Sequence, residues 1–222
     1  MAAFRPKFIT FDCYGTLIYF EMAPVARRLY AGRVPAERMD AFIADFSSFR
    51  LDEVLGAWQP YKDVVANALI RSCKLHGIDY RDSDAEAVYA AVPTWGPHPD
   101  VVAPLTRVAR EIPIVGLTNS MIDLIPPSIE KLEAPFHKVI TAEETGAYKP
   151  RMRGFEYMLD VLGARPEEVM HCSSSFRYDL MTAHDMHFGA RVFVNRRHEP
   201  SNPTYSTHEI ADLGGLPGLV GL

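Results

Sequence analysis

The stretch FITFDCYGTL, residues 8–17, begins with a mainly apolar run and continues into a turn that contains an aspartate and a glycine. The run at 8–11 predicts a buried strand, and Asp12 then stands at its carboxyl end, where open α/β sheets carry their chemistry. Gly15 allows the backbone to turn closely past a ligand. A carboxylate in this place can act as a covalent nucleophile. The alternative is a turn or helix-capping residue, because Asp is common at strand ends.

The residue two positions after Asp12 is Tyr14. A metal-dependent phosphoryl-transfer site needs a second carboxylate near the first, either to hold Mg²⁺ or to protonate a leaving oxygen. Tyrosine is not such a group. The sequence therefore predicts a nucleophile with little help for metal binding, and we expect neither a metal nor another cofactor.

The rest of the chain shows two different patterns. The first is helical, with helices expected at 22–30, 36–55, 61–76 and 84–92. From residue 100 strands and helices alternate, with strands expected at 113–118, 138–140, 169–172 and 191–194. We therefore expect an α/β fold, a Rossmann-like doubly wound parallel sheet formed by residues 1–17 and 96–222, with a helical cap of residues 18–95 inserted after the first strand. Residues 214–222 are expected to form a weakly structured end.

Composition narrows the class of protein. The 222 residues are 48% hydrophobic, which is enough for one sizeable core and a small second lobe. The net charge of −5 gives no basic surface for nucleic acid. The three cysteines have unrelated spacings, which indicates a reducing compartment without disulfides. No signal-peptide pattern or membrane-spanning run is found, so we expect a soluble cytoplasmic protein that does not bind membranes.

Four motifs in order resemble those of the haloacid dehalogenase superfamily, whose members attack their substrates with the carboxylate that corresponds to Asp12. Together they cover almost the whole chain. They are the stretch at 8–17, IVGLTN at 114–119, YKP at 148–150, and VMHCSSS at 169–175 followed by Asp179 and Gly189.

Two replacements indicate a branch of that superfamily. Its phosphatases carry two further acids, at positions that hold Tyr14 and Ser174 here, so that two magnesium ligands are lost. In this respect the chain resembles the type II 2-haloacid dehalogenases, metal-free enzymes that displace a halide from C2 of a small carboxylic acid. The resemblance implies a hydrolase that forms an ester on Asp12 and releases a 2-hydroxy acid, with L-2-haloacids as the first substrates to test.

The resemblance also implies roles for the catalytic residues. Lys149 is expected beside Asp12, where its charge keeps the carboxylate ionised. Asp179 and Ser174 are expected on the water side, where Asp179 could orient Lys149 or, with the serine hydroxyls, position the hydrolytic water. The alternatives are a surface lysine before a loop proline, and a carboxylate that stabilises the start of a helix.

Three further residues are implied as substrate contacts. Thr118, with nearby backbone amides, would bind the substrate carboxylate, and Asn119 would assist leaving-group binding. Arg50 follows an aromatic residue in the cap and matches the arginine that binds the departing halide. The alternatives are an ordinary turn for the first two, and for Arg50 an exposed arginine paired with a neighbouring acid.

The chain departs from the branch at three positions. Phe176 stands where asparagine is common, Arg151 follows the Lys-Pro pair in place of aspartate, and Phe155 replaces a tyrosine. The residues that could form an aromatic enclosure between cap and core are Tyr14, Tyr19, Phe20, Trp58, Phe176 and Tyr178. Core packing is the alternative for each of them. An enclosure of this kind would suit a protonated amine as leaving group, so an azetidine-2-carboxylate ring-opening hydrolase of the same mechanism stays open.

Two other functions are weaker alternatives. The missing acids argue against a small-molecule phosphatase, and the intact Asp12, Lys149 and Asp179 argue against a non-catalytic binding module. Homodimers are usual among the relatives, and the sequence identifies no interface for one. His171, His184 and His187 show no ligand-like spacing, and the last two are expected to be surface or packing residues.

Overall fold

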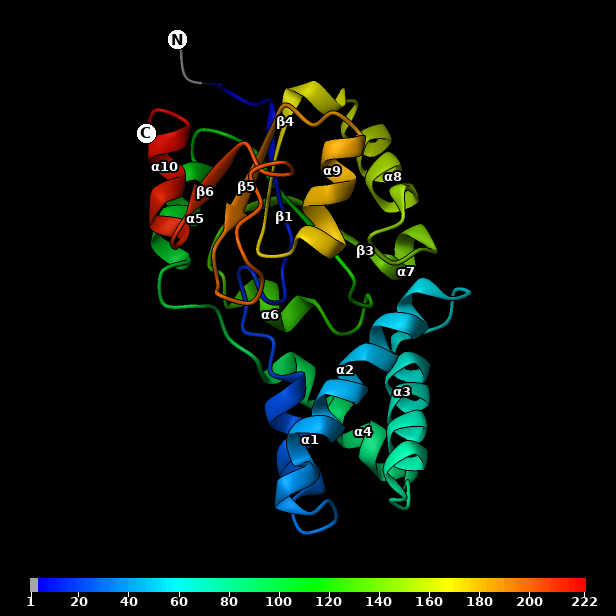
Figure 1. The fold of residues 1–222 in the computed structure, drawn as a ribbon. Coiled ribbons are helices and arrows are strands. Elements are labelled where there is room, and N and C mark those ends of the chain that lie inside the picture. The colour runs from blue at the N-terminus through cyan, green and yellow to red at the C-terminus, as the bar shows by residue number, and fades with distance from the viewer. Residues whose placement is uncertain (1–3) are drawn as a thin grey trace. The chain divides into compact units, whose positions relative to one another are not determined.

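The computed structural model describes residues 4–222, which divide into two compact units (Figure 1). The sheet unit consists of the residues up to Tyr19 together with Gly96–Leu222, and the helical unit consists of Phe20–Trp95. The chain therefore leaves the sheet unit at residue 20, whereas the cap was expected to begin at residue 18.

The sheet unit is built on one parallel sheet. Its six described strands have the order β3-β2-β1-β4-β5-β6, and each neighbouring pair is parallel. The strands are β1 (Phe8–Phe11), β2 (Ile114–Thr118), β3 (Phe136–Thr141), β4 (Val169–Ser173), β5 (Ala190–Val194) and β6 (His208–Ile210). The strand order reverses direction between β1 and β4, and in open α/β sheets this is the switch point where ligands bind.

Apolar sequence explains why the central strands lie where they do. All residues of β1, β2 and β4 are buried, as expected for strands covered by helices on both faces. Figure 1 shows α5 and α10 on one side of the sheet and α8 and α9 on the other. The helices of this unit are α5 (Val102–Ala109), α6 (Pro126–Glu130), α7 (Ala142–Thr145), α8 (Met152–Leu162), α9 (Met181–Asp185) and α10 (Leu216–Leu219). The predicted doubly wound α/β fold is confirmed.

Helix α8 shows how the core forms. Its buried residues Phe155, Met158, Leu159 and Leu162 follow helical spacing and pack in one cluster with side chains of β2 and β3. The helix ends at Gly163, which takes the left-handed conformation (φ 55°). At position 155 the resemblance implies a tyrosine, and the phenylalanine found there is fully buried in this cluster.

The helical unit consists of four helices, which agree with the segments expected from the sequence. They are α1 (Met22–Tyr30), α2 (Met39–Leu55), α3 (Tyr61–His76) and α4 (Asp82–Ala91). A largely buried ion pair joins the turn after α1 to α4. Arg33 donates to both carboxylate oxygens of Asp84 at 2.8 and 2.9 Å, and the Tyr30 hydroxyl donates to the same carboxylate at 3.0 Å. Among the helices described, none is long and apolar enough to cross a bilayer.

The expectation of a weakly structured end at 214–222 is wrong. A short 3₁₀ helix at Leu213–Gly215 leads directly into α10, and Leu213 and Leu216 are fully buried. The carboxylate of Asp100 accepts a hydrogen bond from the Leu213 backbone N–H at 2.7 Å. Burial of these leucines stabilises a segment whose glycines and proline had indicated irregular structure.

Candidate active site

The nucleophile candidate Asp12 lies just after β1, at the switch point of the sheet. Gly15 adopts a positive φ of 94°, so the turn after Asp12 uses the freedom that glycine provides. Lys149 Nζ donates to Asp12 Oδ1 at 2.8 Å, and Thr16 Oγ1 donates to Oδ2 at 2.7 Å. Each oxygen of the carboxylate is therefore held by its own donor, which fixes the direction of the carboxylate.

Lys149 is buried among three oxygen acceptors. Its Nζ donates to Asp12 Oδ1 at 2.8 Å, to Asp179 Oδ1 at 2.7 Å and to the Leu117 carbonyl at 2.8 Å. An ammonium group has three protons, so every one of them is used. Burial by itself would lower the pKa of Lys149, but the two carboxylates raise it above its usual range. Lys149 therefore stays charged and balances one of the two carboxylates.

Asp179 lies on the π-helical segment Phe176–Leu180 and is fully buried. Besides the lysine, His171 Nε2 donates to its Oδ1 at 3.0 Å and Ser173 Oγ donates to its Oδ2 at 3.0 Å. Burial works to raise the pKa of Asp179, but the charge of Lys149 and the hydrogen bond from His171 lower it below its usual value. These contacts match the expectation that Asp179 orients Lys149.

Ser174 joins the same cluster through its hydroxyl and its backbone. Ser174 Oγ donates to the Gly15 carbonyl at 3.0 Å, and Ser174 N donates to Thr16 Oγ1 at 2.9 Å. The structure thus brings together Asp12, Lys149, Asp179 and Ser174, which are far apart in the sequence.

The two residues after strand β2 have different surroundings. The Thr118 hydroxyl is buried and makes no hydrogen bond to a nitrogen or oxygen atom in the part of the chain that the structure describes, and its side chain interacts with the Cys13 thiol. Asn119 binds the backbone of Lys149: its Nδ2 donates to the Lys149 carbonyl at 3.0 Å, and its Oδ1 accepts from the Lys149 N–H at 2.6 Å. The contacts of Asn119 therefore position the backbone of the lysine, and its expected part in leaving-group binding stays a prediction.

The expected aromatic residues of the sheet unit have different contacts. The Tyr14 hydroxyl bonds to Ser128 Oγ at 3.0 Å, and the Tyr19 ring stacks on His98 with centroids 4.0 Å apart. Tyr178 lies half-buried on the π-helical segment.

Phe176 has a different environment from the one expected. Its side chain is 5% exposed and packs against Phe193, with ring centroids 4.4 Å apart. Leu180 belongs to the same core cluster. This packing does not support the expectation that Phe176 lines an open aromatic enclosure, because the ring is already used in the core.

Arg50 belongs to the helical unit, on α2. Its guanidinium lies 4.6 Å from the ring centroid of Phe20 and donates to the Tyr61 hydroxyl at 3.1 Å. The acids near it in sequence, Asp52 and Glu53, both form ion pairs with Arg71. The ring contact and the hydrogen bond together hold the guanidinium of Arg50 in place.

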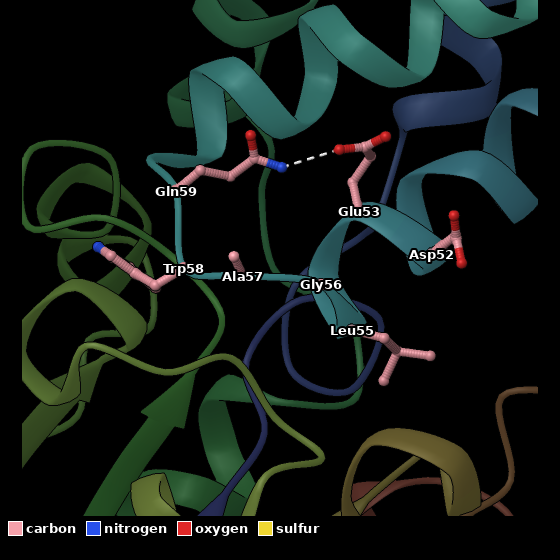
Figure 2. Close-up of a pocket in the computed structure, with 7 residues that line it drawn as sticks. All are labelled: Asp52, Glu53, Leu55, Gly56, Ala57, Trp58 and Gln59. Carbon is pink, nitrogen blue, oxygen red and sulfur yellow. Dashed lines mark hydrogen bonds between the residues drawn. The ribbon is translucent and has the colours of Figure 1, made fainter.

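Trp58 lines a pocket of about 460 Å³ in the same unit. Figure 2 shows that the pocket is formed by the end of α2 and the loop that follows, and that Gln59 bonds to Glu53 across it. The residues that line it are Asp52, Glu53, Leu55, Gly56, Ala57, Trp58 and Gln59.

Two residues that contact the catalytic candidates were not expected in the site. Thr16 could have been found from its position in the first motif, four residues after Asp12. His171 gave a weaker signal, namely a polar side chain inside the apolar strand β4. Over residues 4–222, no group of three or more His, Cys, Asp and Glu side chains is arranged to hold a metal ion.

A family model described as haloacid dehalogenase-like hydrolase matches residues 6–187. The chain therefore belongs to the haloacid dehalogenase-like hydrolases, and it is an enzyme of the hydrolase class. The family resemblance expected from the four motifs is confirmed. A comparison with curated proteins found no match.

Solved structures with the same fold include dehalogenases. A dehalogenase determined as an intermediate complex is 20% identical, with 100% of both chains covered and a TM-score of 0.82. The L-2-haloacid dehalogenase of Xanthobacter autotrophicus, with chloropropionic acid covalently bound, is 21% identical over 97% of this chain and 98% of that one, with a TM-score of 0.77.

A magnesium-bound relative has the same fold as well. The HAD-hydrolase YfnB of Bacillus subtilis, bound to magnesium, is 14% identical over 98% of this chain and 100% of that one, with a TM-score of 0.83. Identities this low show a common fold only. The residues of the site distinguish metal-free from metal-dependent chemistry.

Proposed function

We propose that this hydrolase is a metal-independent L-2-haloacid dehalogenase that works through an ester on Asp12. The observation that carries the proposal is the Asp12 carboxylate, held on one side by a fully bonded ammonium and on the other by the Thr16 hydroxyl. Burial raises the pKa of Asp12, and the charge of Lys149 opposes that effect. An oriented carboxylate at a sheet switch point is suited to in-line attack on a carbon atom.

The proposed reaction has two steps. An oxygen of Asp12 attacks C2 of the haloacid, and the carbon–halogen bond breaks with its electron pair leaving on the halide. Water then attacks the carbonyl carbon of the new ester, and the 2-hydroxy acid departs with the oxygen that came from Asp12. One proton of the water goes to the hydroxyl of the product and the other is released, while the oxygen of the water stays on Asp12.

The surroundings of the carboxylates support chemistry without a metal. The positions of the two acids found in the phosphatases hold Tyr14, whose hydroxyl bonds to Ser128, and Ser174, whose hydroxyl bonds to a backbone carbonyl. Asp179 accepts protein donors at both oxygens. Lys149 thus supplies a positive charge in contact with both carboxylates.

Two further groups support a 2-haloacid as the substrate. Among the described residues the buried hydroxyl of Thr118 has only the weakly bonding Cys13 thiol beside it, and so it can donate to the substrate carboxylate. Arg50 is the candidate for the leaving group, and a cation favours a departing halide over a protonated ring nitrogen. Azetidine-2-carboxylate is therefore the second substrate to test.

A single-turnover experiment in H₂¹⁸O tests the proposal directly. Enzyme in excess over L-2-chloropropionate, with EDTA present, should release chloride and unlabelled lactate, and the peptide that contains Asp12 should gain 2 mass units by the exchange of one oxygen. The variant Asp12→Asn is the control and should release no chloride in the assay.

Other outcomes would distinguish the alternatives. Label in the product and none in Asp12 would contradict the ester mechanism. Turnover of L-azetidine-2-carboxylate alone, with label in Asp12, would keep the mechanism and change the leaving group. No turnover of either acid, together with Mg²⁺-dependent cleavage of phosphate esters, would overturn the proposal in favour of a phosphatase.

A further inference from the structure

His171 is a fully buried histidine in the middle of β4, and the proposed reaction assigns it no role. Its Nε2 lies 3.0 Å from Asp179 Oδ1, and its Nδ1 lies 2.7 Å from Thr10 Oγ1. The rings of Phe155 and Phe188 stand edge-on to the imidazole, with centroids 5.5 and 6.1 Å away. The imidazole is therefore enclosed by apolar rings and has one polar contact at each nitrogen.

The hydrogen bonds fix where its proton lies. An ionised carboxylate only accepts, so Nε2 must carry the proton that is donated to Asp179. The Thr10 hydroxyl has one proton, and its two acceptors are His171 Nδ1 at 2.7 Å and the Met170 carbonyl at 3.5 Å. The shorter contact is the better hydrogen bond, so the Thr10 hydroxyl holds the imidazole at Nδ1 and keeps Nε2 directed at Asp179.

The charged groups around His171 are few. Asp179 faces it from the π-helical segment, and Lys149 lies beyond that carboxylate. Arg191 is its register partner on β5, and the guanidinium of that residue donates to the carbonyls of Phe188 and Tyr205 at 2.9 and 3.0 Å. The contact with Asp179 is therefore the one through which His171 can act on the site.

We propose that His171 is a positioning residue for the nucleophile: its Nε2–H fixes Asp179, Asp179 fixes the Lys149 ammonium, and Lys149 fixes Asp12. The contacts form one continuous series of 2.7, 3.0, 2.7 and 2.8 Å from Thr10 to Asp12. The inference rests on the proposed function only in taking Asp12 as the reacting group.

Loss of the His171 donor should act in two ways. The Asp179 carboxylate would be held by Lys149 and by the neutral Ser173 hydroxyl alone, and so it could rotate. The hydrogen bond from His171 also helps to lower the pKa of Asp179 against the opposing effect of burial. Without it, protonation of Asp179 begins at a higher pH, and activity should be lost earlier on the acid side.

The matched variants are His171→Leu and His171→Gln. Leucine fills the space between the two phenylalanines without a donor, whereas glutamine carries an amide N–H near the position of Nε2. His184→Leu is the control, because His184 is a half-buried histidine of α9 that packs edge-on against Tyr205.

The first readout needs no substrate. Nitrogen-15 spectra of the wild-type protein should show His171 with a protonated Nε2. The ammonium signal of Lys149 should shift in His171→Leu and stay in place in His184→Leu. A Lys149 signal that is the same in His171→Leu as in wild type would overturn the proposal, whatever the enzyme acts on.

The second readout uses turnover of L-2-chloropropionate. A hydrogen bond to a charged group corresponds to a loss of about 10- to 100-fold in kcat for His171→Leu, with KM changed less than about 2-fold. The acid limb of kcat/KM should move to higher pH, and His171→Gln should recover most of the activity.

The outcomes separate the two proposals. Wild-type kcat and pH profile in His171→Leu would overturn the positioning role. A wild-type enzyme inactive on every 2-substituted acid would overturn the proposed function, and the Lys149 signal would then decide the positioning role. If His171→Leu does not fold, Thr10→Val provides the same test, because it removes the hydroxyl that holds the imidazole at Nδ1.

Discussion

At the scale of single residues, Lys149 is the group on which the site depends most. It is the positive charge in direct contact with both Asp12 and Asp179, and all three groups are shielded from water. Two carboxylates in such a place repel each other unless a cation lies between them. In the proposed mechanism the same lysine therefore serves both the stability of the fold and the chemistry.

We expect Lys149→Met to lower the free energy of unfolding at neutral pH by about 3–5 kcal/mol, because it leaves two buried carboxylates without a counter-charge. Urea denaturation followed by circular dichroism measures this. The control Lys138→Met removes a half-buried surface pair with Glu144 (3.4 Å) and should cost about 0–1 kcal/mol. Equal losses in the two variants would show that the buried cluster contributes no special stability.

Residue type and motif predicted some contacts of the site, whereas other contacts are seen only in the structure. The sequence predicted Asp12 and Lys149 because a carboxylate at a strand end and a lysine in a matching motif are local signals. Asn119 was assigned to the leaving group, but its amide binds the backbone of Lys149 on both sides. A side-chain amide can pair with many partners, and only the folded loops decide which one lies within reach.

At the scale of elements, the π-helical segment Phe176–Leu180 combines two functions. Asp179 points to the lysine, whereas Phe176 packs into the core against Phe193. The position where related dehalogenases commonly carry asparagine therefore contributes packing here.

We expect Phe176→Ala to lower the free energy of unfolding by about 3–5 kcal/mol, as is typical of a large aromatic residue removed from a core. Thermal and urea unfolding measure the loss. Met181→Ala, one residue beyond the segment and 40% exposed, should stay within about 0.5 kcal/mol of wild type. A Phe176→Ala protein with wild-type stability and a changed KM would instead place the ring in the substrate pocket.

In the helical unit, the pair Arg33–Asp84 makes stability depend on pH. Burial would raise the pKa of Asp84, but Arg33 and the Tyr30 hydroxyl hold it below its usual value. Because the folded-state pKa is the lower one, the pair stabilises the fold above the unfolded pKa of about 3.9 and this contribution is lost as the pH falls through the folded-state pKa.

Denaturation of wild type and Asp84→Asn between pH 2 and pH 7 checks this prediction. Wild-type stability should fall more steeply below about pH 4 than that of Asp84→Asn, which has no carboxylate to protonate. Asp40→Asn is the control: that residue pairs with Arg27 at an exposed site, and the variant should keep the wild-type pH dependence. Parallel curves for all three proteins would contradict the expected contribution of Asp84.

At the scale of the whole molecule, the central question is whether the fold works with or without a metal. Relatives with the same fold include a protein with chloropropionic acid covalently bound and another bound to magnesium. The fold therefore accommodates both kinds of site, and the side chains near Asp12 decide between them.

We expect dialysis against EDTA to leave both the Tm and the turnover of 2-haloacids unchanged, and added Mg²⁺ to raise neither. A ligand that binds the folded state raises its stability by mass action, so calorimetry detects a metal site even when the substrate is unknown. Restored or increased Tm on addition of millimolar Mg²⁺ would contradict the prediction.

By itself the sequence determined the doubly wound fold and the membership of the haloacid dehalogenase-like hydrolases. It also identified Asp12 and Lys149 as catalytic candidates. Strand and helix periodicity and short motifs are local, and so they can be recognised from residues that are neighbours in the chain. Only the tertiary structure decided the contacts of His171 and Asn119, the burial of Phe176 and the helix at the carboxyl end. Each of these depends on which distant side chains meet, because burial and hydrogen bonding are set by the packing of strands and loops far apart in the sequence.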